Sequence, residues 1–150
     1  MKPKNTSIYL FVFLMVLLYI SCSNNNETAS TALLQKHLNA LVTRNIDELK
    51  STLSPSGKID FILSNMTPTK TTDEFIDFHE KMFTDSSWTI NAEIITSNIG
   101  TKIAHFIVEI NYSSITKNNK PFNSLLHTSY LLQKEKNDWY VVLDHATTIK

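Results

Sequence analysis

The main change in the hydrophobic period of this chain falls at residues 85–87, and no other feature restricts its fold as strongly. Before that point apolar residues recur about every 3.6 residues, which is typical of amphipathic helices. After it, apolar and polar residues alternate to the end of the chain, as in strands with one buried face. Helices that precede a series of strands predict an α+β domain in which the helices cover one face of an antiparallel sheet.

Four long strands are predicted after the change of period. The first carries Trp88 and Ile94 on its apolar face, and the second carries Phe106 and Tyr112. Turns are predicted at residues 98–101, 117–121 and 136–138, because these segments combine glycine, proline, asparagine and charged residues. The last two strands then span residues 122–134 and 139–149.

Three helices and one short strand are predicted in the first half. The first helix spans residues 31–44, where leucines form one stripe. Asn45 with Glu48, and Thr71 with Glu74, have the spacing of a capping box and predict that helices begin there. These helices run over residues 46–53 and to about Thr84, and residues 58–63 between them predict a short strand.

The amino end has the architecture of an export signal. Two lysines precede an apolar run over residues 8–20, too short for a typical membrane span, and Cys22 follows directly. Leu18-Tyr19-Ile20-Ser21-Cys22 resembles the lipobox of bacterial lipoproteins. That resemblance implies cleavage before Cys22 and a lipid on its thiol. We therefore expect a signal peptide over residues 1–21, a lipidated cysteine with a flexible tether over residues 22–30, and one domain over residues 31–150.

The expected location is the bacterial cell envelope, with the protein anchored by its lipid and facing water. The polar residues 23–30 resemble the surface-export signals of Bacteroidetes lipoproteins, although they contain a single acidic residue, Glu27. The periplasmic and the outer faces of the outer membrane both remain open.

Composition excludes several classes of protein. Loss of Lys2 and Lys4 with the signal leaves 12 basic against 14 acidic residues, a balance that does not favour nucleic-acid binding. One cysteine excludes an internal disulfide, a cysteine-based zinc site and an iron–sulfur cluster. Two glycines, Gly57 and Gly100, cannot form a glycine-rich phosphate loop. No cofactor and no metal ion are expected.

The order of three helices and four long strands, over about residues 30–149, resembles the SnoaL-like group of the NTF2-like superfamily. The residues that carry the resemblance are Ser129-Tyr130-Leu131, the turn Lys136-Asn137-Asp138, Trp139, Val141, Asp144, His145 and Thr147. The resemblance implies a cone, in which three N-terminal helices pack on a strongly curved antiparallel sheet of about four long strands plus a short early strand. The cone encloses a pocket. Its members include ketosteroid-isomerase-like and polyketide-cyclase-like enzymes, association domains and transport factors, so function depends on the pocket.

Candidate pocket residues follow from strand alternation. On the last strand His145 shares a face with Trp139 and Val141, and Asp144 lies on the opposite face. His37 and His105 are expected to face solvent. The residues expected to line a ligand pocket are His79, Trp88, His127, Ser129 and His145. Each histidine has the alternative role of a core residue with one hydrogen bond, and no His-x-His spacing suggests a metal site.

An isomerase-like reaction would need an inward carboxylate as general base and a tyrosine near the developing oxyanion. Asp60 lies between Ile59 and Phe61, and Tyr112 is the best inward tyrosine, so Asp60, His79 and Tyr112 are the catalytic candidates. Asp144 is expected to bond a backbone group instead. No G-x-S-x-G elbow is present for a serine nucleophile.

Three functions stay open at this point. We expect a lipid-anchored domain whose pocket binds a small apolar or amphipathic ligand without catalysis, with a homodimer formed through the exposed sheet face. The first alternative is a SnoaL-type cyclase or ketosteroid-isomerase-like enzyme that uses a pocket Asp or His as general base. The second is a structural dimerisation module, which predicts a filled cavity. An inward Asp would favour the enzyme.

Overall fold

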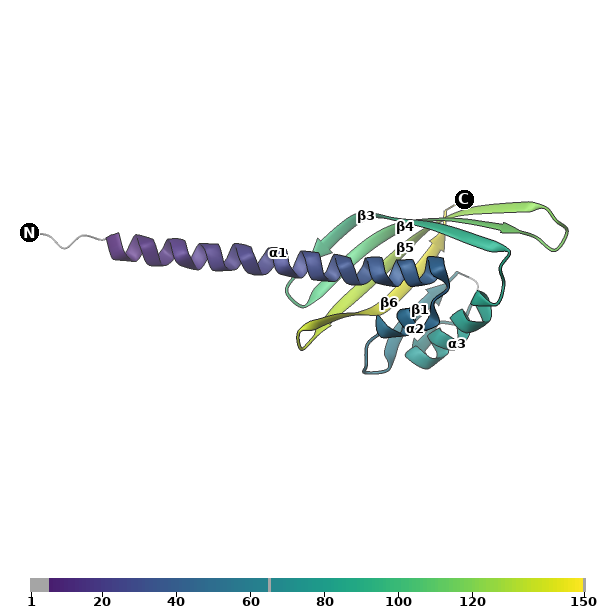
Figure 1. Cartoon of the computed structure of the whole chain (residues 1–150), viewed down its shortest axis with the longest axis horizontal. Helices are drawn as coiled ribbons and strands as arrows, with labels where there is room; N and C mark the ends of the chain where they lie inside the picture. The colour runs from purple at the N-terminus through teal and green to yellow at the C-terminus, as the bar shows by residue number, and fades with distance from the viewer. Residues whose placement is uncertain (1–5, 65, 150) are drawn as a thin grey trace, which may run out of the picture.

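The structure, a computed structural model, describes residues 6–64 and 66–149, and for residues 6–24 it describes the helix but not the side chains (Figure 1). The predicted signal peptide and the side chain of Cys22 therefore lie outside the residues described in full. The elements are α1 (Thr6–Thr43), α2 (Ile46–Ser51), β1 (Lys58–Leu63), β2 (Thr69–Thr71), α3 (Thr72–Phe83), β3 (Trp88–Ile99), β4 (Ile103–Ile115), β5 (Pro121–Glu135) and β6 (Asp138–Thr148).

Helix α1 begins earlier than the sequence predicts. It is continuous through residues 25–30, which were expected to be a flexible tether, and Asn26 and Ser30 in this segment are buried. Lys134 on β5 donates a hydrogen bond from Nζ to Oδ1 of Asn26 at 2.8 Å. This contact and the helical hydrogen bonds order a polar segment that has no apolar stripe. In the part of the chain that the structure describes, no helix is both long and apolar enough to cross a membrane.

The two shorter helices begin where their capping residues predict. The Asn45 side chain accepts a hydrogen bond from the backbone N–H of Glu48 at the start of α2. Thr71 and Glu74 form a complete capping box at α3, with the Thr71 side chain and the Glu74 carboxylate each accepting from the other's backbone N–H. The predicted strand over residues 58–63 is β1.

The sheet has six strands in the order β2-β1-β6-β5-β4-β3 and is curved, with α1 crossing one face and α2 and α3 beside its end (Figure 1). It is mixed rather than wholly antiparallel, because β1 runs parallel to β6, with Asp60 opposite Leu143. A second difference is β2, an unpredicted strand of three residues at the edge of the sheet. The α+β architecture is confirmed, with this correction to the strand directions.

A bulge in β6 changes which residues face the helices. Leu131 of β5 pairs with Leu143, but the next residue, Leu132, pairs with Val141, so that Val142 is an extra residue in β6. Before the bulge Val141 is buried, and after it Asp144 is buried. The inward face of β6 therefore passes from odd-numbered to even-numbered residues.

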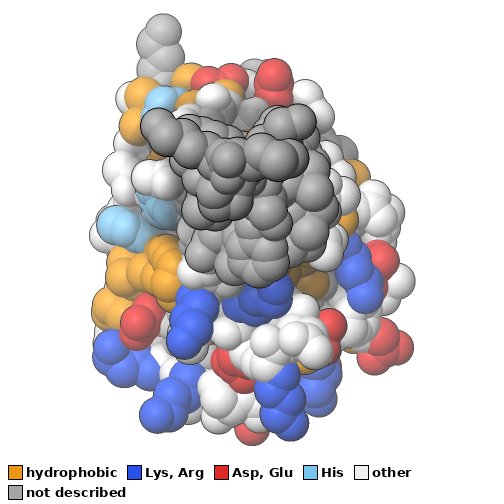
Figure 2. Space-filling model, turned by 90° about the vertical axis from the view of Figure 1, so that its left-hand side faces the viewer, with side chains coloured by type: hydrophobic (Ala, Val, Ile, Leu, Met, Phe, Trp, Pro, Cys, Tyr) orange, Lys and Arg blue, Asp and Glu red, His pale blue; other side chains and the backbone are white. Residues whose placement is uncertain are grey.

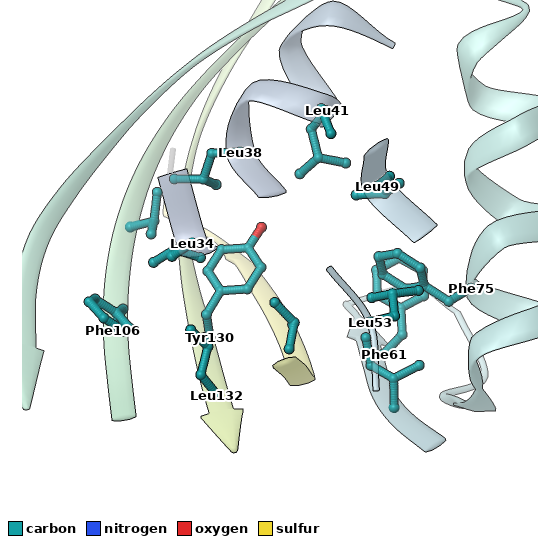
Figure 3. Close-up of a cluster of buried hydrophobic side chains, with 14 of the residues drawn as sticks. Leu34, Leu38, Leu41, Leu49, Leu53, Phe61, Phe75, Phe106, Tyr130 and Leu132 are labelled. Atoms are coloured by element: carbon teal, nitrogen blue, oxygen red, sulfur yellow. The ribbon is translucent and has the colours of Figure 1, made fainter. Parts of the chain in front are cut away.

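The core lies between the sheet and the helices (Figure 3). Leu34 and Leu38 of α1 lie over Tyr130 and Leu132 of β5, and Phe75 of α3 lies near Phe61 of β1. The Phe61 and Phe75 rings meet edge to face with centroids 5.0 Å apart, a favoured aromatic geometry. Packing of this kind fixes the helices on the sheet and leaves one end of the core unfilled.

Candidate functional site

A cavity of about 220 Å³ opens between α3 and the sheet. It receives side chains from α1, β1, α3 and all four long strands. Its lining comprises Leu41, Phe61, Leu63, Phe78, His79, Met82, Trp88, Ile90, Ile110, Tyr112, Leu126, Thr128, Tyr130, Asp144 and Ala146. Most of these side chains are apolar or aromatic, and Asp144 is the one carboxylate among them.

Asp144 is the most unusual residue of the cavity. Its side chain is buried, with 4% of the residue exposed. Burial in apolar surroundings disfavours the ionised carboxylate and raises the pKa of Asp144 from 3.8 to about 7. A hydrogen bond with Tyr130 acts in the opposite direction and lowers that pKa by less. The carboxylate can therefore exchange a proton near neutral pH.

Tyr130 is the cross-strand partner of Asp144. Burial raises the pKa of Tyr130 well above its usual range, and the negative charge of Asp144 raises it further. The phenol thus stays protonated and can donate to the carboxylate. Asp144 was expected on the face opposite the pocket, but it is buried beside Tyr130, a residue that had stood out only through the family resemblance.

His79 reaches the cavity from α3, as expected from its inward position. Its Nδ1 lies 2.8 Å from the carbonyl oxygen of Phe75, which can only accept, so Nδ1 carries the proton and donates. Burial lowers the pKa of His79 from 6.5 to about 4. The imidazole is therefore neutral at physiological pH, with an acceptor lone pair on Nε2.

His37 was expected to face solvent but is fully buried in the core. Thr52 donates its hydroxyl proton to the carbonyl oxygen of Leu49, so its oxygen accepts from His37 Nδ1, 2.7 Å away. The Nε2 atom of His37 is buried and has no partner. Burial lowers the pKa of His37 to about 3, so this ring is also neutral. The position of His37 at the edge of an apolar stripe could not predict this partner, because Thr52 lies 15 residues later, at the C-cap of α2.

Trp88 borders the cavity from the start of β3. Its indole N–H donates to the carbonyl oxygen of Met82 at 3.0 Å. Outside the cavity lining, the guanidinium of Arg44 lies 4.3 Å from the ring centroid and donates to the Trp88 carbonyl oxygen. Arg44 also ends α1 in the left-handed region, with φ of 54°. These contacts fix the orientation of the Trp88 ring.

Of the three catalytic candidates, the structure places His79 and Tyr112 at the cavity and Asp60 elsewhere. Tyr112 is half-buried, and its ring stacks near Trp88 at an interplanar angle of 16°. Asp60 lies in an open groove on the other face of the sheet, where Lys70 donates to it at 3.0 Å. Its place between two apolar residues predicted the strand correctly, but the apolar neighbours, not Asp60, face the core.

Three further predicted pocket residues, His127, Ser129 and His145, also lie on the outer face of the sheet. The even-numbered Thr128 and Tyr130 of β5 are buried inward, so their odd-numbered neighbours face outward. His127 lies 3.6 Å from Glu109 across the strands there. His145 is outward because the bulge precedes it. His127 and His145 therefore do not share a cavity with His79, although all three were expected to line one pocket.

Histidine and hydrophobic side chains lie next to one another on part of the surface shown in Figure 2. Among the residues that the structure describes, no group of three His, Cys, Asp or Glu side chains has the geometry to hold a metal ion.

No family model and no curated protein matches the sequence. Solved structures do match. LinA-type3, a hexachlorocyclohexane dehydrochlorinase from Novosphingobium barchaimii, has a TM-score of 0.75 at 8% identity, over 86% of this chain and 90% of that chain. A ketosteroid isomerase-like protein from Erwinia carotovora has a TM-score of 0.71 at 13% identity, over 82% and 95%.

A proposed dehydratase of the NTF2-like family from Streptomyces avermitilis has a TM-score of 0.71 at 10% identity, over 85% of this chain and 99% of that chain. At identities this low the superpositions establish a common fold only, and the chemistry depends on the residues of each cavity. The helices, the curved mixed sheet and these superpositions together show that the chain has the NTF2-like α+β cone fold.

Proposed function

We propose that this protein is an enzyme that moves a proton to or from carbon in a small, neutral, largely apolar substrate, with Asp144 as general base. One observation carries the proposal: a buried carboxylate with a pKa of about 7 faces an apolar cavity. A general base is most effective when its pKa is close to the working pH. This reverses the preference that the sequence alone supported, because the inward carboxylate was hidden by the bulge.

The proposed step begins with ionised Asp144, which takes a proton from a C–H bond next to a carbonyl group. The electron pair of that bond moves to the carbonyl oxygen and forms an enolate. Tyr112 lines the same cavity and supplies a phenolic hydroxyl that can donate to this oxygen. Protonated Asp144 then returns the proton to the same carbon or to another one. General acid–base catalysis of this kind contributes about 10²–10⁴-fold in rate.

The cavity also restricts the substrate. Its volume of about 220 Å³ lies below the ~300–1,000 Å³ of typical small-molecule sites, which favours a ligand of roughly one or two rings. Neutral His79 and a mainly apolar lining give little to bind an anion. The substrate class is therefore a small neutral ketone or a molecule of similar polarity.

Deuterium exchange tests the proposal without knowledge of the natural substrate. The small two-ring ketone 2-indanone is incubated with the protein in D₂O, and exchange of its α-hydrogens is followed by NMR. We expect the wild-type rate to rise with pH and to level off above about pH 7, as Asp144 ionises. Asp144→Asn should abolish the catalysed rate, whereas His145→Asn, on the outer face, should preserve it. Equal rates for wild type and Asp144→Asn would refute the proposal.

A second candidate is ligand binding without catalysis, which the mainly apolar lining favours. It predicts that 2-indanone binds to the wild-type protein but exchanges no faster than in Asp144→Asn. A purely structural dimerisation module is less well supported, because such a module needs no cavity and this domain has one.

We also propose that the protein is attached to a membrane of the bacterial envelope through a lipid on Cys22. The lipobox-like residues 18–22 and the basic, apolar segment before them support this. More than one acyl chain would make the attachment stable. The domain would then act on molecules that reach the envelope, and a homodimer through the outer sheet face stays part of the proposal.

A further inference from the structure

Asp144 has no cationic partner among the described residues. The ion pairs there, Lys70 with Asp60 and His127 with Glu109, both lie away from the cavity. The titratable groups that line the cavity beside Asp144 are His79 from α3, Tyr112 from β4 and Tyr130 from β5. A tyrosine side chain carries no positive charge, and the lowered pKa of His79 keeps its imidazole neutral at physiological pH. An ionised Asp144 is therefore a buried negative charge without a counter-charge.

Arg44 contacts the lining residue Trp88 but is already engaged. Its guanidinium lies on the Trp88 ring and donates to the Trp88 carbonyl oxygen. It is not part of the cavity lining and does not contribute to the shift in the pKa of Asp144. A positive charge that pairs with Asp144 has to come from a ligand.

The remaining lining is suited to such a charge. Five aromatic residues border the cavity with Asp144: Phe61, Phe78, Trp88, Tyr112 and Tyr130. The face of an aromatic ring is negative and attracts a cation within about 6 Å of its centroid. Desolvated cation–π contacts are the usual means by which proteins recognise organic ammonium ions. An aromatic lining with one carboxylate therefore has the composition of an ammonium-binding site.

We propose that the cavity binds the ammonium group of a small lipophilic amine, with the Asp144 carboxylate as its counter-ion and the aromatic side chains around its apolar part. This goes beyond the proposed reaction, because it uses Asp144 as a fixed anion and not as a base. An amine in the cavity blocks the approach of a neutral substrate to Asp144, so the two ligands compete.

The pairing makes binding depend on pH in a defined direction. A bound cation favours the ionised carboxylate, so the protein must lose the Asp144 proton in order to bind when the pH lies below about 7. For a ligand with a permanent charge, affinity then increases about tenfold per pH unit up to that pH and is constant above it. Neutral ligands of the same shape show no such increase.

Two ligands of the same shape, one charged and one neutral, separate the effect of the ligand's charge on affinity from the effect of its shape. Phenyltrimethylammonium and tert-butylbenzene have nearly the same shape, and only the first is a cation. Their affinities for the full domain are measured by calorimetry at pH 5.5 and pH 8. We expect the cation to bind at least tenfold more tightly than tert-butylbenzene at pH 8, and to lose that preference at pH 5.5.

Asp144→Asn and His145→Asn are the test and control variants. Asp144→Asn should bind tert-butylbenzene as well as the wild type does and should lose the preference for the cation, whereas His145→Asn should keep it. The inference is refuted if the cation binds no more tightly than tert-butylbenzene at pH 8, if Asp144→Asn retains the preference, or if neither probe binds.

The result can be separated from that of the proton-transfer reaction. If Asp144-dependent exchange of 2-indanone occurs but the cation is not preferred, only the ammonium site is wrong. If the cation is preferred but no exchange occurs, only the general base is wrong. If both hold, phenyltrimethylammonium should inhibit the exchange competitively.

Discussion

Replacement of Asp144 by Asn should change the way in which the stability of the protein depends on pH. The pKa of Asp144 rises from 3.8 to about 7 on folding, a difference of about 3 pKa units. Each unit corresponds to about 1.4 kcal/mol, so ionised Asp144 reduces the free energy of unfolding by about 4 kcal/mol relative to protonated Asp144. The asparagine side chain cannot ionise and does not carry this cost.

The direction follows from proton binding. Between about pH 4 and pH 7 the folded state keeps the Asp144 proton while the unfolded state releases it, so this residue makes the protein less stable as pH rises. His37 and His79 have the opposite effect, because burial lowers their pKa values to about 3 and about 4. Between those values and about pH 6.5, the unfolded state binds their protons and the folded state does not, so acid destabilises the protein through them.

The histidine contributions cancel when the two proteins are compared at the same pH. The free energy of unfolding is measured by urea denaturation for wild type and Asp144→Asn from pH 4 to pH 8.5. The free energy of unfolding of Asp144→Asn, relative to that of the wild type, should increase by about 4 kcal/mol over this range, with most of the change complete near pH 7. A difference that does not vary with pH would show that the Asp144 carboxylate is hydrated and would remove the basis of both proposals.

Three further perturbations test other parts of the structure. Thr52→Val removes the acceptor of the buried His37 Nδ1 proton and should destabilise the protein by about 1–3 kcal/mol in urea denaturation, whereas Thr43→Val on the exposed end of α1 should cost less than about 0.5 kcal/mol. His79→Ala should lower the affinity for 2-indanone by calorimetry, while an unchanged affinity would place His79 outside the ligand contacts. Cys22→Ala should move the protein from the membrane to the soluble fraction after cell fractionation, and an unchanged distribution would contradict lipid attachment.

Local interactions explain which elements were predictable. The Thr71 and Glu74 pair determines where α3 begins through two hydrogen bonds between near neighbours, so the sequence is sufficient to find it. β1 was found because its apolar residues alternate over a short range. The same reasoning missed the parallel pairing of β1 with β6, because contacts between distant segments leave no local pattern.

The orientation of β5 could not be read from its sequence. Its even-numbered face carries Tyr130 and Leu132, and its odd-numbered face carries Leu131 and Leu125, so both faces are partly apolar. Burial by α1 decides between them, because Leu34 and Leu38 lie over the even-numbered face. A choice of the wrong face placed His127 in the cavity, since a shift of one residue exchanges every side chain of a strand.

The bulge at Val142 has the largest consequence for function. Strict alternation from Val141 would put His145 inward, and the extra residue instead puts Asp144 beside Tyr130 at the cavity. A core selected for stability alone would place an apolar residue there, because an ionised carboxylate at this site costs about 4 kcal/mol above neutral pH. Buried groups with strongly shifted pKa values concentrate at functional sites, where such a cost is tolerated in exchange for activity. Asp144 faces the cavity with a tyrosine as its hydrogen-bond partner, and among the described residues no cation pairs with it. The fold does not require a carboxylate at this position, so the proposed roles in proton transfer and ammonium binding account for it better than stability does.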